Sequence, residues 1–373
     1  MKKNSRKNHV AADLTVFREQ APGAFVIGID TGDRYCQICV MDQQGNVIQK
    51  GRLRTEGRVL NEQFSVLARQ RVVFETGTHS PWMSRLLSAC GHEVIVANAR
   101  KVRLITENDQ KSDEVDAFLL ADLGRTNVKL LSPVEHRGQE AQQDLAIIRA
   151  RETLVAMRTG AINHARGVVK SNGGRLPKCG SDVFAEKVAG DIPEALRRGL
   201  SGVMETIDEL SDHINRYDSE VAHLIETKYP QAKLMMQING VGELTALAFL
   251  LTLDDPHRFA HSRTVGAYLG LVTKRRQSGE RDPQLGISKA GNELVRKLLV
   301  NCAHHILGHK GEDSALRRWG LRLMARGGKK ARKRAATAVA RKLAVLMHHL
   351  WVTAEVYEPL RGCKPLEETS VAA

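Results

Sequence analysis

The stretch Ala24-Phe-Val-Ile-Gly-Ile-Asp30 is a short apolar run with β-branched residues, bounded by Gly23 and Gly32. Such a run predicts a buried strand. Two further strands are expected over 35–41 and 47–53, because Asp42-Gln-Gln-Gly-Asn46 between them contains turn-forming residues. The chain therefore begins its folded part with a meander of strands.

Strands and helices alternate after this meander. A helical stretch is followed by a strand over 71–75, a helix over 81–90 and a strand over 93–97. This order indicates an α/β fold with a mixed sheet. We expect that domain over residues 24–135, preceded by a flexible arm over residues 1–23.

The middle of the chain predicts two long helices of opposite charge. Apolar pairs recur every seven residues from Ile147/Ile148 to Val168/Val169 on an otherwise basic helix. After a Gly- and Pro-containing break over 172–193, a second helix carries an apolar seam and an acidic outer face. We predict a helical coiled-coil linker over 136–232, as an antiparallel hairpin or a dimerising arm, with two ordinary bundle helices as the alternative.

Residues 233–355 predict a mostly helical C-terminal domain, followed by a tail over 356–373. Within it, Ile238-Asn-Gly-Val-Gly242 precedes a helix-forming segment and predicts a helix-hairpin-helix element. Gly240 and Gly242 permit a tight approach, and the backbone N–H groups at the following helix start can hold a phosphate.

The charge of the whole chain favours a polyanionic partner. Its 373 residues include 56 Lys and Arg against 42 Asp and Glu, a formal charge of +14. In a globular chain of average composition this excess points to nucleic acid, with a merely basic enzyme as the alternative. No apolar run approaches the ~20 residues of a membrane span, and the N-terminus has no apolar signal core. We therefore expect a cytoplasmic protein with no membrane partner.

The cations are densest between Gly320 and Lys342, where nine Lys and Arg occur with no acidic residue. A patch this one-sided repels itself unless it is counter-charged, which favours nucleic-acid contact over a solvated helix face. The candidate nucleic-acid contacts are Gly240, Gly242, Lys274, Arg275, Arg276, Lys289, Lys329, Lys330, Arg332, Lys333 and Arg334.

Four carboxylates are candidates for a metal site. Asp30 and Glu75 each end a predicted strand, where side chains face the crevice in which α/β sheets bind ligands. Asp113 and Asp116 open a predicted helix and share one of its faces, although Ser112 or Asp113 also suits a helix cap. Converging carboxylates need a cation, and hard divalent ions such as Mg²⁺ take oxygen ligands and support phosphoryl transfer. Surface acids are the alternative interpretation.

The segment Gly28-Ile-Asp-Thr-Gly32 has a rival interpretation. A strand, an Asp and a Gly turn also open the phosphate-binding hairpin of actin-like ATPases and sugar kinases. That fold needs a second Asp-containing phosphate loop and a Gly-rich adenosine loop, and the sequence offers no convincing match to either.

Ser278 lies in a Gly-flanked loop after Lys274-Arg-Arg276. An exposed hydroxyl beside three cations would have a phosphate drawn to it. A serine hydroxyl is a poor nucleophile without activation, and no His is adjacent in sequence, so metals bound by the other domain are the candidate activator. A solvated loop serine is the alternative.

Several motifs occur together in one order: Gly28-Ile-Asp30, Phe74-Glu-Thr-Gly-Thr78, Lys111-Ser-Asp-Glu-Val-Asp-Ala117, Asn239-Gly-Val-Gly242, Tyr268-Leu-Gly-Leu271, Gln277-Ser-Gly279 and Ser288-Lys-Ala-Gly-Asn292. In this order the chain resembles, over roughly residues 24–310, the DEDD-type insertion-sequence transposases with a catalytic serine. These are the recombinases guided by a bridge RNA. The resemblance implies an N-terminal RuvC-like RNase H fold, a coiled-coil linker and a C-terminal transposase domain.

The resemblance also implies site residues and partners. Asp30, Glu75, Asp113 and Asp116 would bind Mg²⁺, with Mn²⁺ as an alternative, and Ser278 would form a covalent phosphoserine link with DNA that strand exchange reseals. Ser288 stands where the family often has Thr and is a second, less favoured hydroxyl. The implied partners are DNA of the element ends and target, a structured non-coding guide RNA, and further copies of the chain in a dimer that assembles to a tetramer.

Two other classes of function stay open. In a metal-dependent DNA nuclease or Holliday-junction resolvase, the carboxylates would activate water and Ser278 would be only structural. In a binding protein without catalytic activity, the acids would be vestigial. The N-terminal arm and the tract over 329–334 have no role that the resemblance transfers.

Overall fold

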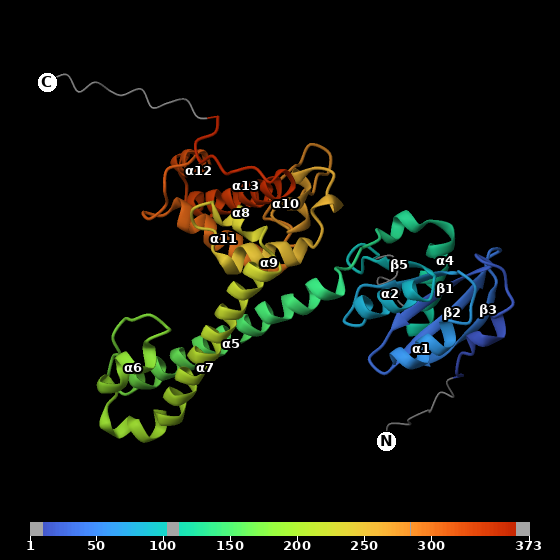
Figure 1. Cartoon of the computed structure of the whole chain (residues 1–373), viewed down its shortest axis with the longest axis horizontal. Helices are drawn as coiled ribbons and strands as arrows, with labels where there is room; N and C mark the ends of the chain where they lie inside the picture. The colour runs from blue at the N-terminus through green and yellow to red at the C-terminus, as the bar shows by residue number, and fades with distance from the viewer. Residues whose placement is uncertain (1–9, 103–111, 284, 363–373) are drawn as a thin grey trace. The chain divides into compact units, whose positions relative to one another are not determined.

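The computed structural model describes residues 10–102, 112–283 and 285–362. The chain divides between His136 and Arg137 into two units, which are described separately below. In Figure 1 the first unit runs from blue to teal and the second from green to red.

A five-stranded mixed sheet with the order β3-β2-β1-β4-β5 forms the centre of the first unit. β1 pairs antiparallel with β2, and β2 with β3, whereas β4 runs parallel to β1 and β5 runs parallel to β4. The predicted meander followed by alternating strands and helices, and hence a mixed α/β sheet, is confirmed. The strands are β1 Phe25–Thr31, β2 Tyr35–Asp42, β3 Val47–Arg54, β4 Arg71–Glu75 and β5 Glu93–Ala97.

Helices cover both faces of this sheet. α1 (Gly57–Phe64) and α2 (Ser80–Ala89) pack with Ile27, Ile29 and Phe74 in one apolar core. α4 (Asp113–Thr126) lies on the opposite face, where its residues pack with those strand residues that alternate with the first set, such as Val26 and Val73. Because both faces are covered, β1 and β4 are apolar almost throughout.

Residues 10–23 do not form the flexible arm that the sequence predicts. Leu14 is buried at the start of a short 3₁₀ helix, Leu14–Phe17, and its N–H donates to Oε1 of Gln63 at 2.7 Å. The Phe17 ring packs on that of Phe25 with centroids 5.2 Å apart. A few apolar residues in a polar segment show no period, so only contact with the sheet reveals their burial. The first nine residues of the predicted arm lie outside the described residues.

Two long helices of the second unit, α5 (Gln139–Ser171) and α7 (Glu194–Thr227), pack against each other (Figure 1). Polar contacts pair Asp144 with Lys228, Arg151 with Asp218, and Arg158 with Ser211, so residue numbers rise on one helix as they fall on the other. The helices therefore form an antiparallel hairpin. Its use as a dimerising arm stays a prediction.

The segment between these helices is more ordered than a simple break. It contains a short helix, α6 (Phe184–Val188), and a 3₁₀ turn, Ala189–Asp191. Phe184 and Val188 are buried in a small core with Ile162 of α5 and Leu200 of α7. A separate apolar cluster therefore closes this end of the hairpin.

The rest of the second unit is a helical domain built around α9 (Glu243–Leu253). Every residue of α9 from Thr245 to Leu253 is buried, because neighbouring helices surround it. Even so, no helix in the described parts of the chain is long and apolar enough to span a lipid bilayer. The surrounding helices are α8 Ala232–Met236, α10 Val265–Tyr268, α11 Glu293–Leu307, α12 Ala315–Ala325 and α13 Ala331–Thr353.

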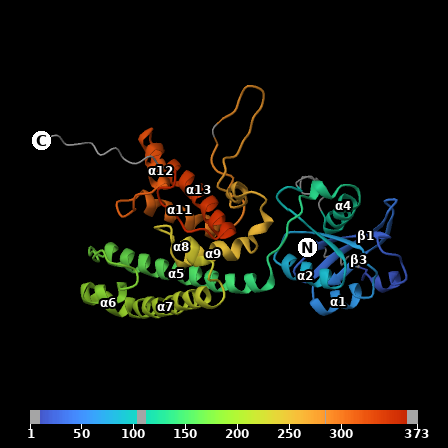
Figure 2. The same cartoon turned by 45° about the horizontal axis from the view of Figure 1, so that its top comes forward.

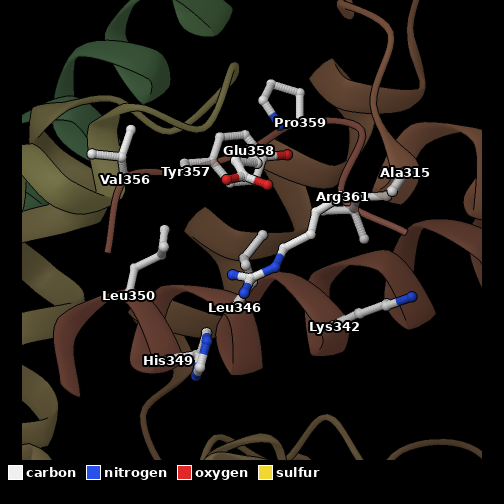
Figure 3. Close-up of a pocket in the computed structure, with 11 residues that line it drawn as sticks. Ala315, Lys342, Leu346, His349, Leu350, Val356, Tyr357, Glu358, Pro359 and Arg361 are labelled. Atoms are coloured by element: carbon white, nitrogen blue, oxygen red, sulfur yellow. The ribbon is translucent and has the colours of Figure 1, made fainter. Parts of the chain in front are cut away.

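Residues 354–362 return along this helical domain as a strap. The N–H of Ala315 donates to the carbonyl of Pro359 at 2.7 Å, and the N–H of Tyr357 donates to Oε1 of Gln237 at 2.9 Å. The strap and α13 border a pocket of about 290 Å³ with apolar and cationic walls, where Figure 3 shows Arg361 and Lys342. The predicted tail beyond residue 362 lies outside the described residues.

Candidate active site

Asp30 and Glu75 lie on neighbouring strands at their carboxyl ends. The parallel register pairs Gly28 with Val73 and Ile29 with Phe74, so Asp30 and Glu75 come next on each strand. Gly28 and Val73 face α4, and strand side chains alternate between faces. Asp30 and Glu75, two residues further on, therefore also lie on the α4 face of the sheet.

The first turn of α4 carries the other two carboxylates. Ser112 caps the helix, because its hydroxyl accepts a hydrogen bond from the N–H of Val115. Asp116 lies one turn before Leu120, which is buried against the sheet, so Asp116 is directed toward the sheet. Asp113 is exposed. The sequence suits either Ser112 or Asp113 as the N-cap of this helix, and the structure shows that Ser112 is the N-cap.

Hydrogen bonds between Thr76, which follows Glu75, and residues 97 and 99 hold the end of β4 beside the end of β5. The N–H of Thr76 donates to the carbonyl of Ala97 at 2.9 Å, and its hydroxyl accepts from the N–H of Ala99 at 3.3 Å. On the other side of β1, burial raises the pKa of the Cys36 thiol, a hydrogen bond with Thr55 lowers it, and the negative charge of Asp30 raises it further. Glu75 is thus placed by bonds to β5, and Asp30 exerts its charge on β2.

The donor set suits a hard divalent cation, since all four candidate ligands are carboxylates. One oxygen each of Glu75 and Asp116 is buried. Among the described residues, however, no group of three or more Asp, Glu, His or Cys side chains stands close enough to hold a metal ion. Asp30 and Glu75 lie on the face of the sheet that α4 covers, and Asp116 on α4 is directed toward that face. The three side chains would have to approach one another further to bind one metal ion.

Ser278 lies at the tip of a long hairpin in the second unit. Thr273 bridges Ile287 near the base, and the backbones of Ser278 and Arg281 exchange two hydrogen bonds of 3.1 Å at the tip. Gly279 follows the serine with a φ of +56°, which this tight turn requires and which glycine adopts without strain. Figure 2 shows the hairpin as a long orange loop rising from the helices. The Ser278 side chain is exposed.

Cations accompany this serine. Lys274, Arg275 and Arg276 are exposed and line an open hollow of about 500 Å³ with residues 285–287. The Arg275 guanidinium is held by an ion pair of 3.3 Å with Asp282. The hairpin thus presents an exposed hydroxyl and a basic surface on one element.

Ser288 occupies a different environment. Its N–H donates to the carbonyl of Val272 at 2.8 Å, and its hydroxyl accepts from the N–H of Ala290 at 3.4 Å. It is half-buried at the base of the hairpin, next to Lys289, which is exposed with a φ of +54°. The Ser288 hydroxyl thus takes part in the base of the hairpin, whereas the Ser278 side chain is exposed at the tip.

The two glycines of the predicted helix-hairpin-helix element differ in their surroundings. Gly240 has a φ of +91°, and a Cβ there would stand 2.9 Å from Cδ2 of His305 on α11. Gly242 precedes α9 and has open space around its Cβ position. Gly240 therefore serves packing, whereas Gly242 leaves the N-terminus of α9 accessible to a ligand.

The basic residues over 329–334, here called the C-terminal tract, form an exposed turn and the first turn of α13. Gly327 and Gly328, with φ of +73° and +94°, reverse the chain before it. Cations at a helix N-terminus oppose the helix dipole, so this cluster disfavours the free helix and suits a polyanion. Its exposed cations are Lys329, Lys330, Arg332, Lys333 and Arg334, and the buried face of the helix begins at Ala335 and Ala336.

Two family models match the chain. A DEDD transposase model of the IS110 group matches residues 27–172, and the model for the transposase IS116/IS110/IS902 family matches residues 232–318. Together they cover more than half of the chain. The chain belongs to the IS116/IS110/IS902 family of transposases. Its mixed sheet fits the RuvC-like DEDD domain. The candidate carboxylates lie within the first match and both serines within the second.

Curated relatives of this IS110-family transposase agree with the assignment. It is 27% identical to the transposase for insertion sequence element IS1111A of Coxiella burnetii, over 89% of this chain and 91% of the relative. It is 27% identical to the transposase for insertion sequence element IS1328 of Yersinia enterocolitica, over 76% of this chain and 84% of the relative. A pilin gene-inverting protein of Moraxella bovis is 22% identical, over 74% and 78%.

In this IS110-family transposase, the residues that hold the base of the hairpin bearing Ser278, the serine hairpin, are not predictable from the sequence. The motifs Tyr268–Leu271 and Ser288–Asn292 were visible, each with a glycine, but their contact with each other was not. Arg296, which joins them, lies in an ordinary helical segment and carries no local signal.

Proposed function

We propose that this transposase cuts and rejoins DNA through a covalent bond between Ser278 and a DNA phosphate. Asp30, Glu75, Asp113 and Asp116 would hold Mg²⁺, or Mn²⁺ in its place. The observation that carries the proposal is the placement of Asp30 and Glu75 at neighbouring register positions on the α4 face. Ser278, exposed at the tip of a basic hairpin, adds support from the second unit.

The proposed reaction is a transesterification. Oγ of Ser278 forms a bond to phosphorus, one phosphorus–oxygen bond to the sugar breaks, and the sugar leaves as a hydroxyl that takes up a proton. In the second step a hydroxyl of the partner strand attacks the phosphoserine and releases the serine. Because a phosphodiester replaces a phosphodiester, the cycle needs no ATP. A bound divalent cation would neutralise the charge that develops on the phosphoryl oxygens.

Residues of this chain would bring the phosphate to the serine. Lys274 and Arg276 border the hollow beside the hairpin and supply positive charge there. The ion pair of Arg275 with Asp282 joins the two arms of the hairpin on either side of the turn. The exposed turn at Gly279 leaves room for a duplex to approach the hydroxyl.

The proposed partners are DNA of the element ends and target, and a structured non-coding guide RNA, acting in the cytoplasm. If base pairing selects the sequence, the protein needs only backbone contacts, which suit exposed lysines and arginines. The tract from Lys329 to Arg334, Lys289 and the N-terminus of α9 at Gly242 supply such groups. We further propose a dimer that assembles to a tetramer through the α5–α7 hairpin.

The decisive experiment replaces each serine. Cells producing the full chain with the DNA that flanks its reading frame are lysed in detergent, and protein-linked DNA is measured beside recombination. We expect Ser278→Ala to abolish both, Ser288→Ala to retain both, and Asp30→Asn to abolish both. DNA cleavage that persists in Ser278→Ala would instead support a metal-dependent nuclease or Holliday-junction resolvase.

Two further results bear on the other parts of the proposal. Recombination that is unchanged by Asp30→Asn would make the carboxylates vestigial and the chain a binding protein. RNA that copurifies with the full chain should be enriched in transcripts of the flanking DNA. Absence of such enrichment would contradict the guide RNA without touching the serine mechanism.

A further inference from the structure

Two glycines interlock at the base of the serine hairpin. Gly270 precedes the hairpin and Gly291 follows it, with φ of +71° and +75°. A Cβ on Gly270 would stand 2.1 Å from the carbonyl oxygen of Ala290, and one on Gly291 would stand 2.0 Å from that of Tyr268. The chain entering the hairpin and the chain leaving it are therefore in a backbone contact that only glycine permits.

Arg296, in the first turn of α11, joins the same two segments. Its Nη1 donates to the carbonyl of Leu269 on the entering side and to that of Ala290 on the leaving side, each at 3.0 Å. A third contact, of 3.5 Å, reaches the carbonyl of Asn292. Because the guanidinium is planar and rigid, these bonds fix the separation of the two segments and their angle to α11.

Asn292 fastens this clamp to α9. Its Oδ1 accepts from the N–H of Val295 at 3.2 Å and so caps α11, while its Nδ2 donates to Oγ1 of Thr252 at 3.1 Å. Thr252 is fully buried, and its carbonyl accepts from the Tyr268 hydroxyl at 3.4 Å and from Nε of Arg137 at 2.9 Å. The base of the hairpin is thereby anchored in the core of the domain.

The tip of the hairpin depends on this anchor for its direction. Beyond the bridge between Thr273 and Ile287, the hydrogen bonds and ion pairs of the described residues join parts of the hairpin to one another and not to a helix. They are a backbone bond of 2.9 Å from Lys274 to Gly286, the turn at Ser278, and the bonds of Arg275 to Gln277 and Asp282. A small rotation at the base is magnified at the tip. In enzymes, a misplacement of about 1 Å can lower a rate by about 100-fold.

We propose that Arg296 and Asn292 are positioning residues that aim Ser278 at the DNA phosphate. The inference rests on the proposed role of Ser278 as the nucleophile. Neither residue needs to touch DNA, so their replacement is expected to slow bond formation at phosphorus while leaving DNA binding intact.

The test uses Arg296→Lys, which keeps the charge but replaces the planar guanidinium by an ammonium group on a flexible stem. Arg317→Lys is a matched control, because Arg317 donates in the same way to the carbonyls of Ile306 and Gly308 at the other end of α11. Both are compared with the unaltered full chain for thermal unfolding, for binding to a plasmid carrying the flanking DNA, and for the rate and position of protein-linked strand breaks.

We expect Arg296→Lys to lower the rate of adduct formation by about 10- to 100-fold and to spread the breaks over neighbouring phosphates, with plasmid binding unchanged. Arg317→Lys should retain the rate and the break position even if it unfolds at a lower temperature. Equal rates in both lysine variants would overturn the proposal.

A second variant keeps the proposal testable if Arg296→Lys does not fold. Asn292→Ser retains a good helix cap but removes the amide that reaches Thr252. This variant should fold normally, but it should form the protein–DNA adduct more slowly and break the DNA at scattered positions. A wild-type rate of adduct formation would overturn the proposal. If Ser278→Ala still forms the adduct, it is the proposed function that fails, and the two failures are thus told apart.

Discussion

Gly28 of β1 lies so close to Ala117 of α4 that a Cβ on Gly28 would stand 2.0 Å from the carbonyl oxygen of Ala117. This contact sets the depth at which α4 rests on the sheet. Asp116 immediately precedes Ala117, and Asp30 lies two residues beyond Gly28 on the same face. The close approach therefore determines where the first turn of α4 meets the end of β1.

Replacing Gly28 with Ala should displace α4 from the sheet. The added methyl group meets backbone on two sides, which cannot yield as a flexible side chain can, so we expect a loss of about 1–3 kcal/mol in the free energy of unfolding and loss of recombination. Gly57→Ala is the control, since a Cβ there would meet only Leu86 and Trp82 at 3.7 and 3.9 Å. Urea unfolding measures both; equal stabilities would contradict this account of the contact.

The stability of both units should fall as the pH drops below about 6.5, the ordinary pKa of histidine. Burial lowers the pKa of His92, although a hydrogen bond to Phe64 partly opposes this, and burial also lowers the pKa of His348. Below this pH the unfolded chain therefore binds protons that the folded chain does not bind. Each histidine then lowers the free energy of unfolding by up to about 1.4 kcal/mol per pH unit.

Urea unfolding at pH 7.5 and 5.5 checks this dependence. His92→Gln should flatten the pH dependence for the first unit, and His348→Gln should flatten it for the second. Retention of the full dependence in the double variant would show that other groups cause it.

The helix hairpin contains a buried arginine whose bond to Ser211 should be measurable. Arg158 is 9% exposed and donates to Oγ of Ser211 at 3.0 Å across the α5–α7 seam. Ser211→Ala removes this acceptor and should cost about 1–3 kcal/mol. Ser219→Ala, on the same helix but exposed, is the control, because the Ser219 hydroxyl, like that of Ser211, donates to the carbonyl four residues earlier but lies away from Arg158. A loss no larger than that of the control would argue against the pair.

Neutralising the C-terminal tract should weaken nucleic-acid binding in a salt-dependent way. We replace Lys329, Lys330, Arg332, Lys333 and Arg334 by Gln. The logarithm of the binding constant falls with the logarithm of the salt concentration, and we expect this slope to become shallower by about 0.9 for each phosphate that the tract no longer neutralises. Lys233→Gln is the control, since Lys233 pairs with Glu226 at 2.5 Å. Binding titrations over a several-fold range of salt concentration measure the slope, and an unchanged slope would remove the tract from the interface.

Local sequence determined the elements of this protein and most of its candidate chemistry. Apolar runs and turn residues were enough to predict β4 and β5 at their observed bounds, because strand signals are short-range. The same signals put Asp30 and Glu75 at strand ends. Opposite charge on two periodic segments predicted the pairing of α5 and α7, since their stripes are visible in each helix alone.

Tertiary structure alone decided how these pieces meet. The register that sets Asp30 beside Glu75, the burial of Leu14, and the different surroundings of Ser278 and Ser288 all arise between segments remote in the chain. The clamp of Gly270, Gly291 and Arg296 is of the same kind. Such contacts depend on which backbones can approach closely, and no local pattern of polarity carries that information.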